Sequence, residues 1–153
     1  MKTRIYTLVL CALALCVWGC KNGNEPESLI GSVEKPNWTA PTKYDYSSSM
    51  TAVVKVNLNA SYTAEQLAAA NYQLSEGDMV AAFSGDECLG IAAPQEDLFF
   101  LYICAPTSGS NVTLRYYSSV LKNLFLAEPF TFANDTQLGT IDEPHTPAFI
   151  ISM

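Results

Sequence analysis

Three short apolar runs follow one another in the middle of the chain, and polar residues separate them. Residues 79–84 and 87–93 flank a polar turn, and residues 98–104 follow the loop Pro94-Gln95-Glu96-Asp97. Apolar runs of this length, bounded by Gly, Pro and acidic residues, are typical of β-strands. The pattern predicts three consecutive antiparallel strands at the centre of an all-β domain. Because the third run is apolar at every position, we expect both of its faces to be covered.

Further strand patterns lie on both sides of this centre. Alternation of apolar and polar side chains predicts half-buried strands over residues 50–58 and 112–117. The segment 124–132 contains Pro129, which favours an edge or bulged strand, and residues 148–152 form a last strand. Seven or eight short strands with frequent turn residues predict an antiparallel β-sandwich, of immunoglobulin-like or jelly-roll-like type.

One short helix is expected among the strands. Thr63 and Gln66 have the spacing of a capping box, and the alanine-rich segment that follows favours helix. We therefore expect a helix over residues 64–71, packed across one end of a sheet, because a helix this short is marginal on its own. A plain loop is the alternative.

The N-terminus has the pattern of an export signal. Two basic residues, Lys2 and Arg4, precede an uncharged apolar run, residues 5–18. This run is shorter than the roughly 20 residues that a membrane-spanning helix needs, and it fits the apolar segment of a signal peptide. The junction that follows, Val17-Trp18-Gly19-Cys20, resembles a bacterial lipobox, although Trp18 stands where small residues are usual.

The lipobox resemblance implies a lipid anchor. Residues 1–19 would be a lipoprotein signal peptide, and Cys20 would become the acylated first residue of a protein held at a membrane of the bacterial cell envelope, the outer membrane. A secreted protein with a chance cysteine at this position is the alternative. The polar, proline-containing residues 20–36 then predict a flexible tether, followed by a domain of residues 37–153.

The charge of the chain narrows the choice of partners. Removal of the signal peptide leaves six basic and fifteen acidic residues, a formal net charge of −9. Nucleic acids and anionic lipids are bound through basic patches, so neither is an expected partner.

Two sequence motifs span the expected domain: Gly77-Asp78-x-Val80-Ala81-Ala82-Phe83-x-Gly85-Asp86-Glu87-Cys88-x-Gly90 and Thr131-Phe132-x-x-Asp135-x-x-x-Gly139-Thr140-x-x-x-Pro144. Together, over residues 38–151, they resemble a small module of surface and secreted proteins of Bacteroidota. The resemblance implies an antiparallel β-sandwich that often has no assigned activity. Leu89 stands where the module frequently has Arg. Gly85 suits a turn with positive φ, and Gly90 suits a close contact between sheets.

Signals of catalysis and of metal binding are weak. His145 is the single histidine, and the chain contains no Gly-x-Ser-x-Gly nucleophile motif. We therefore expect a protein that is not an enzyme and has no metal or cofactor. Five acidic loop residues are the remaining candidates for calcium ligands, but solvated carboxylates are the commoner case. They are Asp78, Asp86, Glu87, Glu96 and Asp97.

A disulfide is expected between Cys88 and Cys104. A hairpin closed by residues 95–97 would place these two cysteines opposite each other, and the envelope is an oxidising compartment. Two buried free thiols are the alternative.

The candidate ligand contacts are aromatic. Trp38, Tyr44 and Tyr46 precede the core strands and lie close together in the sequence. The expected function is a lipid-anchored protein-interaction or adhesion module, and the alternative is a glycan-binding accessory lipoprotein of a nutrient-uptake system. The first is favoured because no cluster of Trp with Asn or Asp marks a sugar platform. The identity of the protein or glycan ligand does not follow from the sequence.

Overall fold

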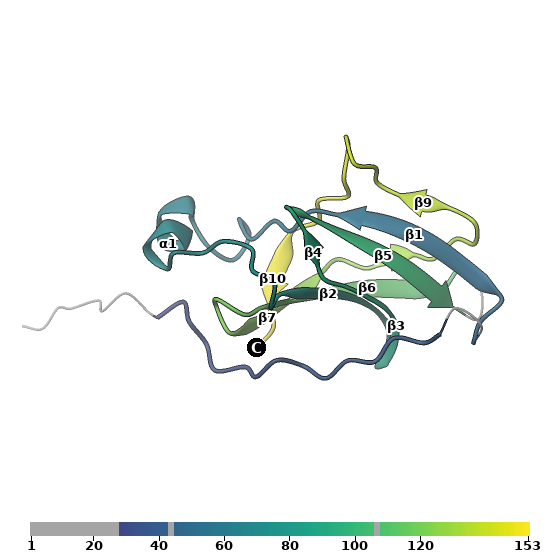
Figure 1. Ribbon diagram of the computed structural model, residues 1–153, viewed down its shortest axis with the longest axis horizontal. Helices are drawn as coiled ribbons and strands as arrows, with labels where there is room; N and C mark the ends of the chain where they lie inside the picture. The colour runs from purple at the N-terminus through teal and green to yellow at the C-terminus, as the bar shows by residue number, and fades with distance from the viewer. Residues whose placement is uncertain (1–27, 43–44, 106–107) are drawn as a thin grey trace, which may run out of the picture.

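The chain folds into two β-sheets packed face to face. A computed structural model describes residues 28–42, 45–105 and 108–153 (Figure 1). The β1 sheet has the spatial order β4 (Pro94–Gln95), β5 (Leu98–Ala105), β1 (Ser48–Val54) and β9 (Gln137–Leu138). The β2 sheet has the order β10 (Phe149–Ile151), β7 (Asn123–Ala127), β6 (Asn111–Ser118), β2 (Met79–Ser84) and β3 (Glu87–Ala92), and β8 (Phe130–Thr131) also pairs with β6. The predicted all-β sandwich is confirmed.

Alternate side chains of both sheets form the core between them. Phe99 of β5, Tyr116 of β6 and Phe149 of β10 are all fully buried. The Tyr116 ring stacks on Phe125 at 5.6 Å and meets the rings of Phe99 and Phe149 edge-on at 6.1 and 5.8 Å. Aromatic pairs of this kind add to the free energy gained by burial, so Tyr116 is the centre of the packing between the sheets.

The first two central strands form the predicted hairpin. β2 and β3 pair antiparallel, with a register shift between Ala82 and Phe83. Gly85 has φ +59° in the turn, as its sequence context predicted. Arg115 of β6 donates to the Gly85 carbonyl at 2.8 Å, and its guanidinium lies 3.9 Å from the centroid of the Phe83 ring. These contacts hold the turn against the neighbouring strand.

The third central strand does not extend this hairpin. After β3 the chain crosses to the other sheet, where β5 pairs along its length with β1 and only its first two residues pair with β4. The two sheets approach closely at this crossing. A Cβ on Gly90 would overlap the carbonyl oxygen of Tyr102, so the sheets can be this close only with glycine at position 90. The predicted role of Gly90 in a close contact between sheets is confirmed.

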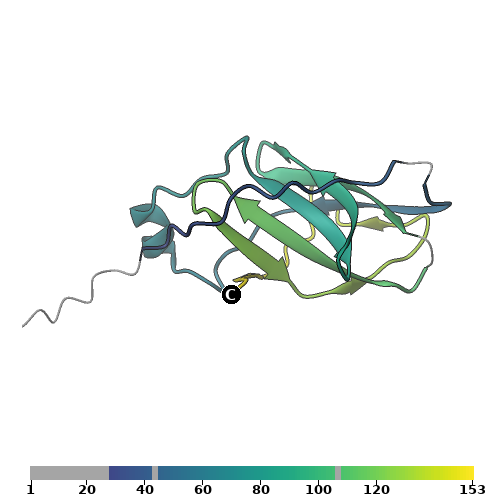
Figure 2. The same cartoon turned by 90° about the horizontal axis from the view of Figure 1, so that it is seen from below.

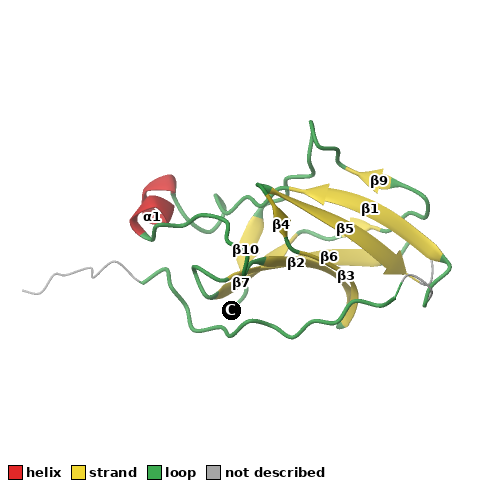
Figure 3. Cartoon of the chain, in the orientation of Figure 1, coloured by secondary structure: helices red, strands yellow, loops and turns green. Residues whose placement is uncertain are grey.

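The predicted helix is α1 (Ala64–Ala69), at one end of the sandwich (Figure 3). Thr63 and Gln66 form the capping box, with each side chain accepting from the other residue's backbone N–H. The helix ends at Ala70 because Asn71 adopts φ +51°. Leu67 packs against the core, which anchors an otherwise exposed helix.

The segment before β1 lies along the outer face of the β2 sheet (Figure 2). We call residues 28–42 the N-terminal strap. The Gly31 and Val33 amides donate to the carbonyls of Leu121 and Lys122 at 2.7 and 2.9 Å, and Tyr117 donates to the Val33 carbonyl at 3.3 Å. These contacts place residues 31–33, which the sequence assigned to the tether, against the folded domain.

The strap explains why β2 is buried on both faces. Val80 and Ala82 face the core, whereas Met79, Ala81 and Phe83 are buried on the opposite face of β2.

Within the part of the chain that the structure describes, no helix is long and apolar enough to cross a membrane.

Candidate functional site

The outer face of the β1 sheet carries exposed aromatic side chains. Along β5, Phe99, Leu101 and Ile103 are buried, but Phe100 and Tyr102 are 38% and 49% exposed. The expectation that both faces of this strand are covered is therefore wrong. Neighbouring residues of a strand point to opposite faces, so Phe100 and Tyr102 share the outer face, about 7 Å apart along the strand.

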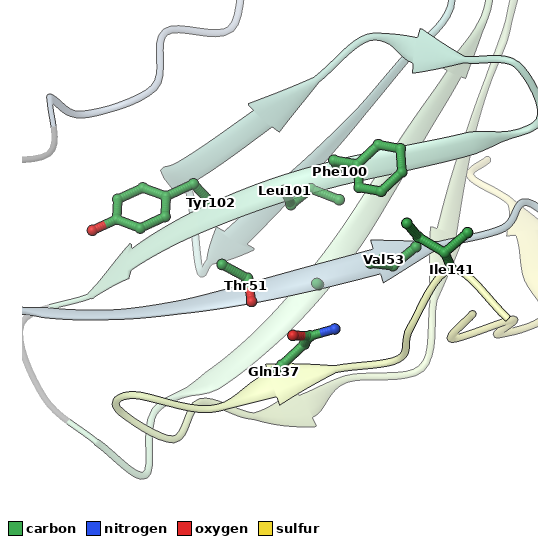
Figure 4. A pocket seen from close by; sticks show the side chains of 8 residues that line it. Thr51, Val53, Phe100, Leu101, Tyr102, Gln137 and Ile141 are labelled. Carbon is green, nitrogen blue, oxygen red and sulfur yellow. The ribbon is translucent and has the colours of Figure 1, made fainter. Parts of the chain in front are cut away.

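The strand pairing arranges this face in two rows (Figure 4). Thr51 of β1 lies opposite Tyr102 on one side and opposite Gln137 of β9 on the other, so these three form a polar row across the sheet. Val53 lies opposite Phe100 and begins a neighbouring apolar row. Ile141, from the loop after β9, is 68% exposed and completes the apolar row.

A shallow groove of about 380 Å³ follows these rows. It is lined by both rows, and a second hollow of about 310 Å³ shares Thr51 and Gln137 with it. Ser49, Asp135 and Thr136 line the second hollow. The groove is thus aromatic and aliphatic at one end and polar at the other.

The polar row offers hydrogen-bonding groups to a ligand. The Gln137 Nε2 donates to the Gly139 carbonyl at 2.9 Å, which fixes the amide and leaves its oxygen as an acceptor. Within the described part of the chain, the hydroxyls of Thr51 and Tyr102 have no hydrogen-bond partner. Each hydroxyl can both donate and accept, so the row can bind a ligand with either kind of polar group.

An exposed ion pair lies beyond the apolar row. Lys55 comes directly after β1, and its ammonium lies 2.6 Å from the Asp97 carboxylate. The hydrogen bond and the charge of Lys55 lower the pKa of Asp97. Both side chains are half-exposed, so the pair contributes little to stability and marks the polar rim of the groove.

The aromatic residues singled out from the sequence lie elsewhere. Trp38 belongs to the strap on the opposite side of the sandwich, where its ring meets the Phe83 ring edge-on at 5.4 Å. Tyr46 donates a hydrogen bond to the Glu87 carboxylate, which raises the pKa of Tyr46. Tyr44 lies outside the described residues. The structure does not bring Trp38 or Tyr46 into the groove, and the groove is the stronger candidate for the ligand surface.

The structure places half-buried Cys88 and buried Cys104 on different sheets, without a bond between them. Cys88 lies opposite Phe83 in the β2 sheet, while Cys104 lies opposite Ser49 in the β1 sheet. The hairpin pairing that suggested a disulfide covers only Pro94 with Phe99 and Gln95 with Leu98. The disulfide stays a prediction, and intact mass before and after reduction tests it.

Asp78, the first acidic residue of the first motif, is held in a network of hydrogen bonds inside the domain. Asp78 is 1% exposed and accepts hydrogen bonds from the Ser119 amide and hydroxyl, both at 2.7 Å, and from the Tyr116 hydroxyl at 2.8 Å. Among the residues that the structure describes, no group of three or more His, Cys, Asp or Glu side chains is placed to hold a metal ion. Asp78 therefore fixes the start of β2.

Phe100 and Tyr102 were missed because their sequence pattern is ambiguous. Each stands between two aliphatic or aromatic neighbours, so the run shows no polar alternation. The only available signal was the spacing of two large aromatics at positions two apart, which places them on one face of a strand.

Comparison of the chain with known protein families, with curated proteins and with solved structures found no match. The fold and the groove define an all-β sandwich with one open, partly aromatic sheet face. Cys20, the cysteine of the lipobox-like junction, lies outside the described residues.

Proposed function

We propose that this protein is a non-catalytic binding module, lipid-anchored through Cys20 in the bacterial cell envelope, that holds its ligand on the outer face of the β1 sheet. The observation that carries the proposal is the exposure of Phe100 and Tyr102 at the centre of that face. On the outer face of the β2 sheet, by contrast, the strap covers the part formed by β2 and the turn between β6 and β7. Exposed apolar patches on folded domains commonly mark interaction sites.

The leading ligand class is a protein. The apolar row of Val53, Phe100 and Ile141 gives a contiguous apolar strip on an open face, bounded by the Lys55–Asp97 ion pair. An aromatic centre with a charged rim is the usual anatomy of a protein interface. The groove is shallow, which suits a protein surface or an extended peptide.

A glycan is the second candidate, and the polar row favours it. Sugars combine apolar C–H faces with hydroxyl groups, so they bind where an aromatic ring lies beside fixed amides and hydroxyls. Tyr102, Thr51 and Gln137 offer these groups side by side. The protein would then act as an accessory binding protein of a nutrient-uptake system.

Photo-crosslinking in cells tests the surface. A photoreactive amino acid at position 102 should give a discrete protein adduct, and Phe100→Ala should reduce its yield at least fivefold. Position 33 in the strap is the control, because Val33 is 38% exposed and Tyr102 is 49% exposed. Equal adducts at positions 102 and 33 would contradict the proposed face.

A glycan array separates the two ligand classes. The protein class predicts no strong hit. A hit that Tyr102→Ala and Gln137→Ala abolish, while Phe100→Ala leaves part of it, would place the glycan first.

Membrane fractionation tests the anchor. Cys20→Ala should lose both the lipid label and the membrane association, whereas Cys88→Ala should keep both. Unchanged membrane association of Cys20→Ala would contradict lipid anchoring at this residue.

A further inference from the structure

A second apolar surface lies on the outer face of the β2 sheet. Leu126 of β7 lies opposite Ile150 of β10, so both point to this face, and Ile150 is 50% exposed. They line a groove of about 270 Å³. We call Leu126 and Ile150 the β7–β10 patch.

The patch lies close to the point where the strap joins the domain. The Asn123 side chain at the start of β7 donates to the Leu29 carbonyl at 2.8 Å. The next residue, Leu124, accepts from the Ser152 amide at 2.8 Å. The first residues of the strap and the last residues of the chain are therefore attached to neighbouring positions of one strand.

The length of chain before the strap limits how far this region can lie from a lipid at Cys20. Eight residue steps separate Cys20 from Ser28. Even a fully extended chain spans no more than about 3.6 Å per residue, so the start of the strap lies within about 30 Å of the anchored residue. The β1 sheet, whose outer face carries the ligand groove, forms the other layer of the sandwich (Figure 1).

We propose that the β7–β10 patch rests against the lipid surface into which Cys20 is acylated. This proposal rests on the lipid anchor of the proposed function. The patch is aliphatic, and the exposed carboxylate of Glu128 lines the same groove. A negative rim disfavours anionic lipid, so the contact is apolar and suits a surface of uncharged, zwitterionic headgroups. The ligand groove then faces away from the membrane.

Quenching of tryptophan fluorescence by brominated lipid tests the patch. Trp38 is the single tryptophan after residue 19, so Trp38→Phe provides a background without tryptophan and keeps a ring beside Phe83. In this background Ile150→Trp reports on the patch, Leu126→Trp on the facing strand is a second probe of it, and Phe100→Trp is the matched control on the opposite face. The acylated protein is reconstituted into phosphatidylcholine vesicles that carry bromine near the headgroups.

The expected result is at least threefold stronger quenching at positions 126 and 150 than at position 100. Equal quenching at all three positions, in protein that floats with the vesicles, would overturn the patch and leave the anchor intact. Protein that does not float would overturn the anchor and this proposal with it. Equal quenching together with self-association in detergent that Ile150→Asp abolishes would assign the patch to a second copy of the chain, and would also overturn the proposal.

Discussion

Tyr116 donates its phenolic hydrogen to the carboxylate of Asp78 at 2.8 Å, and this bond joins β6 to the residue that precedes β2. The Tyr72 hydroxyl lies 3.0 Å from that of Tyr116 and extends the network. Burial raises the pKa of Tyr116 well above its usual range, so the hydroxyl stays protonated. Ser119, in the turn after β6, binds the other Asp78 oxygen.

Removal of the Asp78 carboxylate should destabilise the domain more than removal of the Tyr116 hydroxyl. Asp78→Ala leaves the Ser119 amide and two hydroxyls without their acceptor, and we expect a loss of about 3 kcal/mol in the free energy of unfolding. Tyr116→Phe keeps the ring contacts and should lose about 1–2 kcal/mol. Urea denaturation measures both. Equal losses would mean that the bond to Tyr116 accounts for the whole contribution of the carboxylate and that the Ser119 bonds add nothing.

Gly90 should be intolerant of any side chain. A methyl group there meets the Tyr102 carbonyl, which is backbone and cannot rotate away, so Gly90→Ala should lose about 2–3 kcal/mol. Gly85→Ala is the control, because a Cβ at Gly85 meets nothing within 4 Å. Its positive φ alone should make this change unfavourable by about 1 kcal/mol. If Gly85→Ala were the more damaging of the two, the close approach of the sheets would be in doubt.

Gly31→Ala should release the strap without unfolding the sandwich. A Cβ at Gly31 would overlap the Asn123 side chain and the Lys122 carbonyl. We expect faster hydrogen exchange at the amides of residues 31 and 33, while the amides of β2 and β6 stay protected. Hydrogen exchange with mass spectrometry measures this. Uniformly faster exchange would show that the strap and the sandwich unfold together.

His145 should make stability fall as the solution becomes acidic. Burial lowers its pKa below the ordinary value of 6.5, so the unfolded chain takes up this proton more readily than the folded one. Stability is therefore lost progressively as the pH falls from about 6.5 toward the folded-state pKa. Compared with His145→Gln, the native protein should lose more stability between pH 7.5 and pH 5. Parallel pH profiles of the two proteins would contradict this.

Features set by local sequence were predicted well. The capping box of Thr63 and Gln66 and the turn at Gly85 depend on residues a few positions apart, and both have the predicted geometry. The expectation of one edge or bulged strand over residues 124–132 is wrong: the segment divides at Glu128-Pro129 into β7, which lies between β10 and β6, and β8, because proline has no amide hydrogen to continue a ladder. The strand expected over residues 50–58 ends at Val54, where the next amide pairs with the His145 carbonyl.

Features set by distant parts of the chain were not predictable. The apolar run of β5 gives no sign of which face another sheet covers, so the exposure of Phe100 and Tyr102 could not be seen. The strap has the polar, proline-containing composition of a linker, yet its backbone pairs with residues 121 and 122. The groove depends on β9 lying beside β1, a parallel pairing between segments far apart in sequence.

The strap also sets an order of events in folding. Its partners in β6, β7 and the turn between them follow it by 84 to 94 positions, as with Tyr117 to Val33 and Asn123 to Leu29. Closing so long a loop is slow compared with forming a hairpin, and the surface that receives the strap does not exist until β6 and β7 have paired. The segment that leaves the ribosome first among those described is thus among the last to dock, and until then Phe83 and Met79 stand uncovered on a sheet that has already formed.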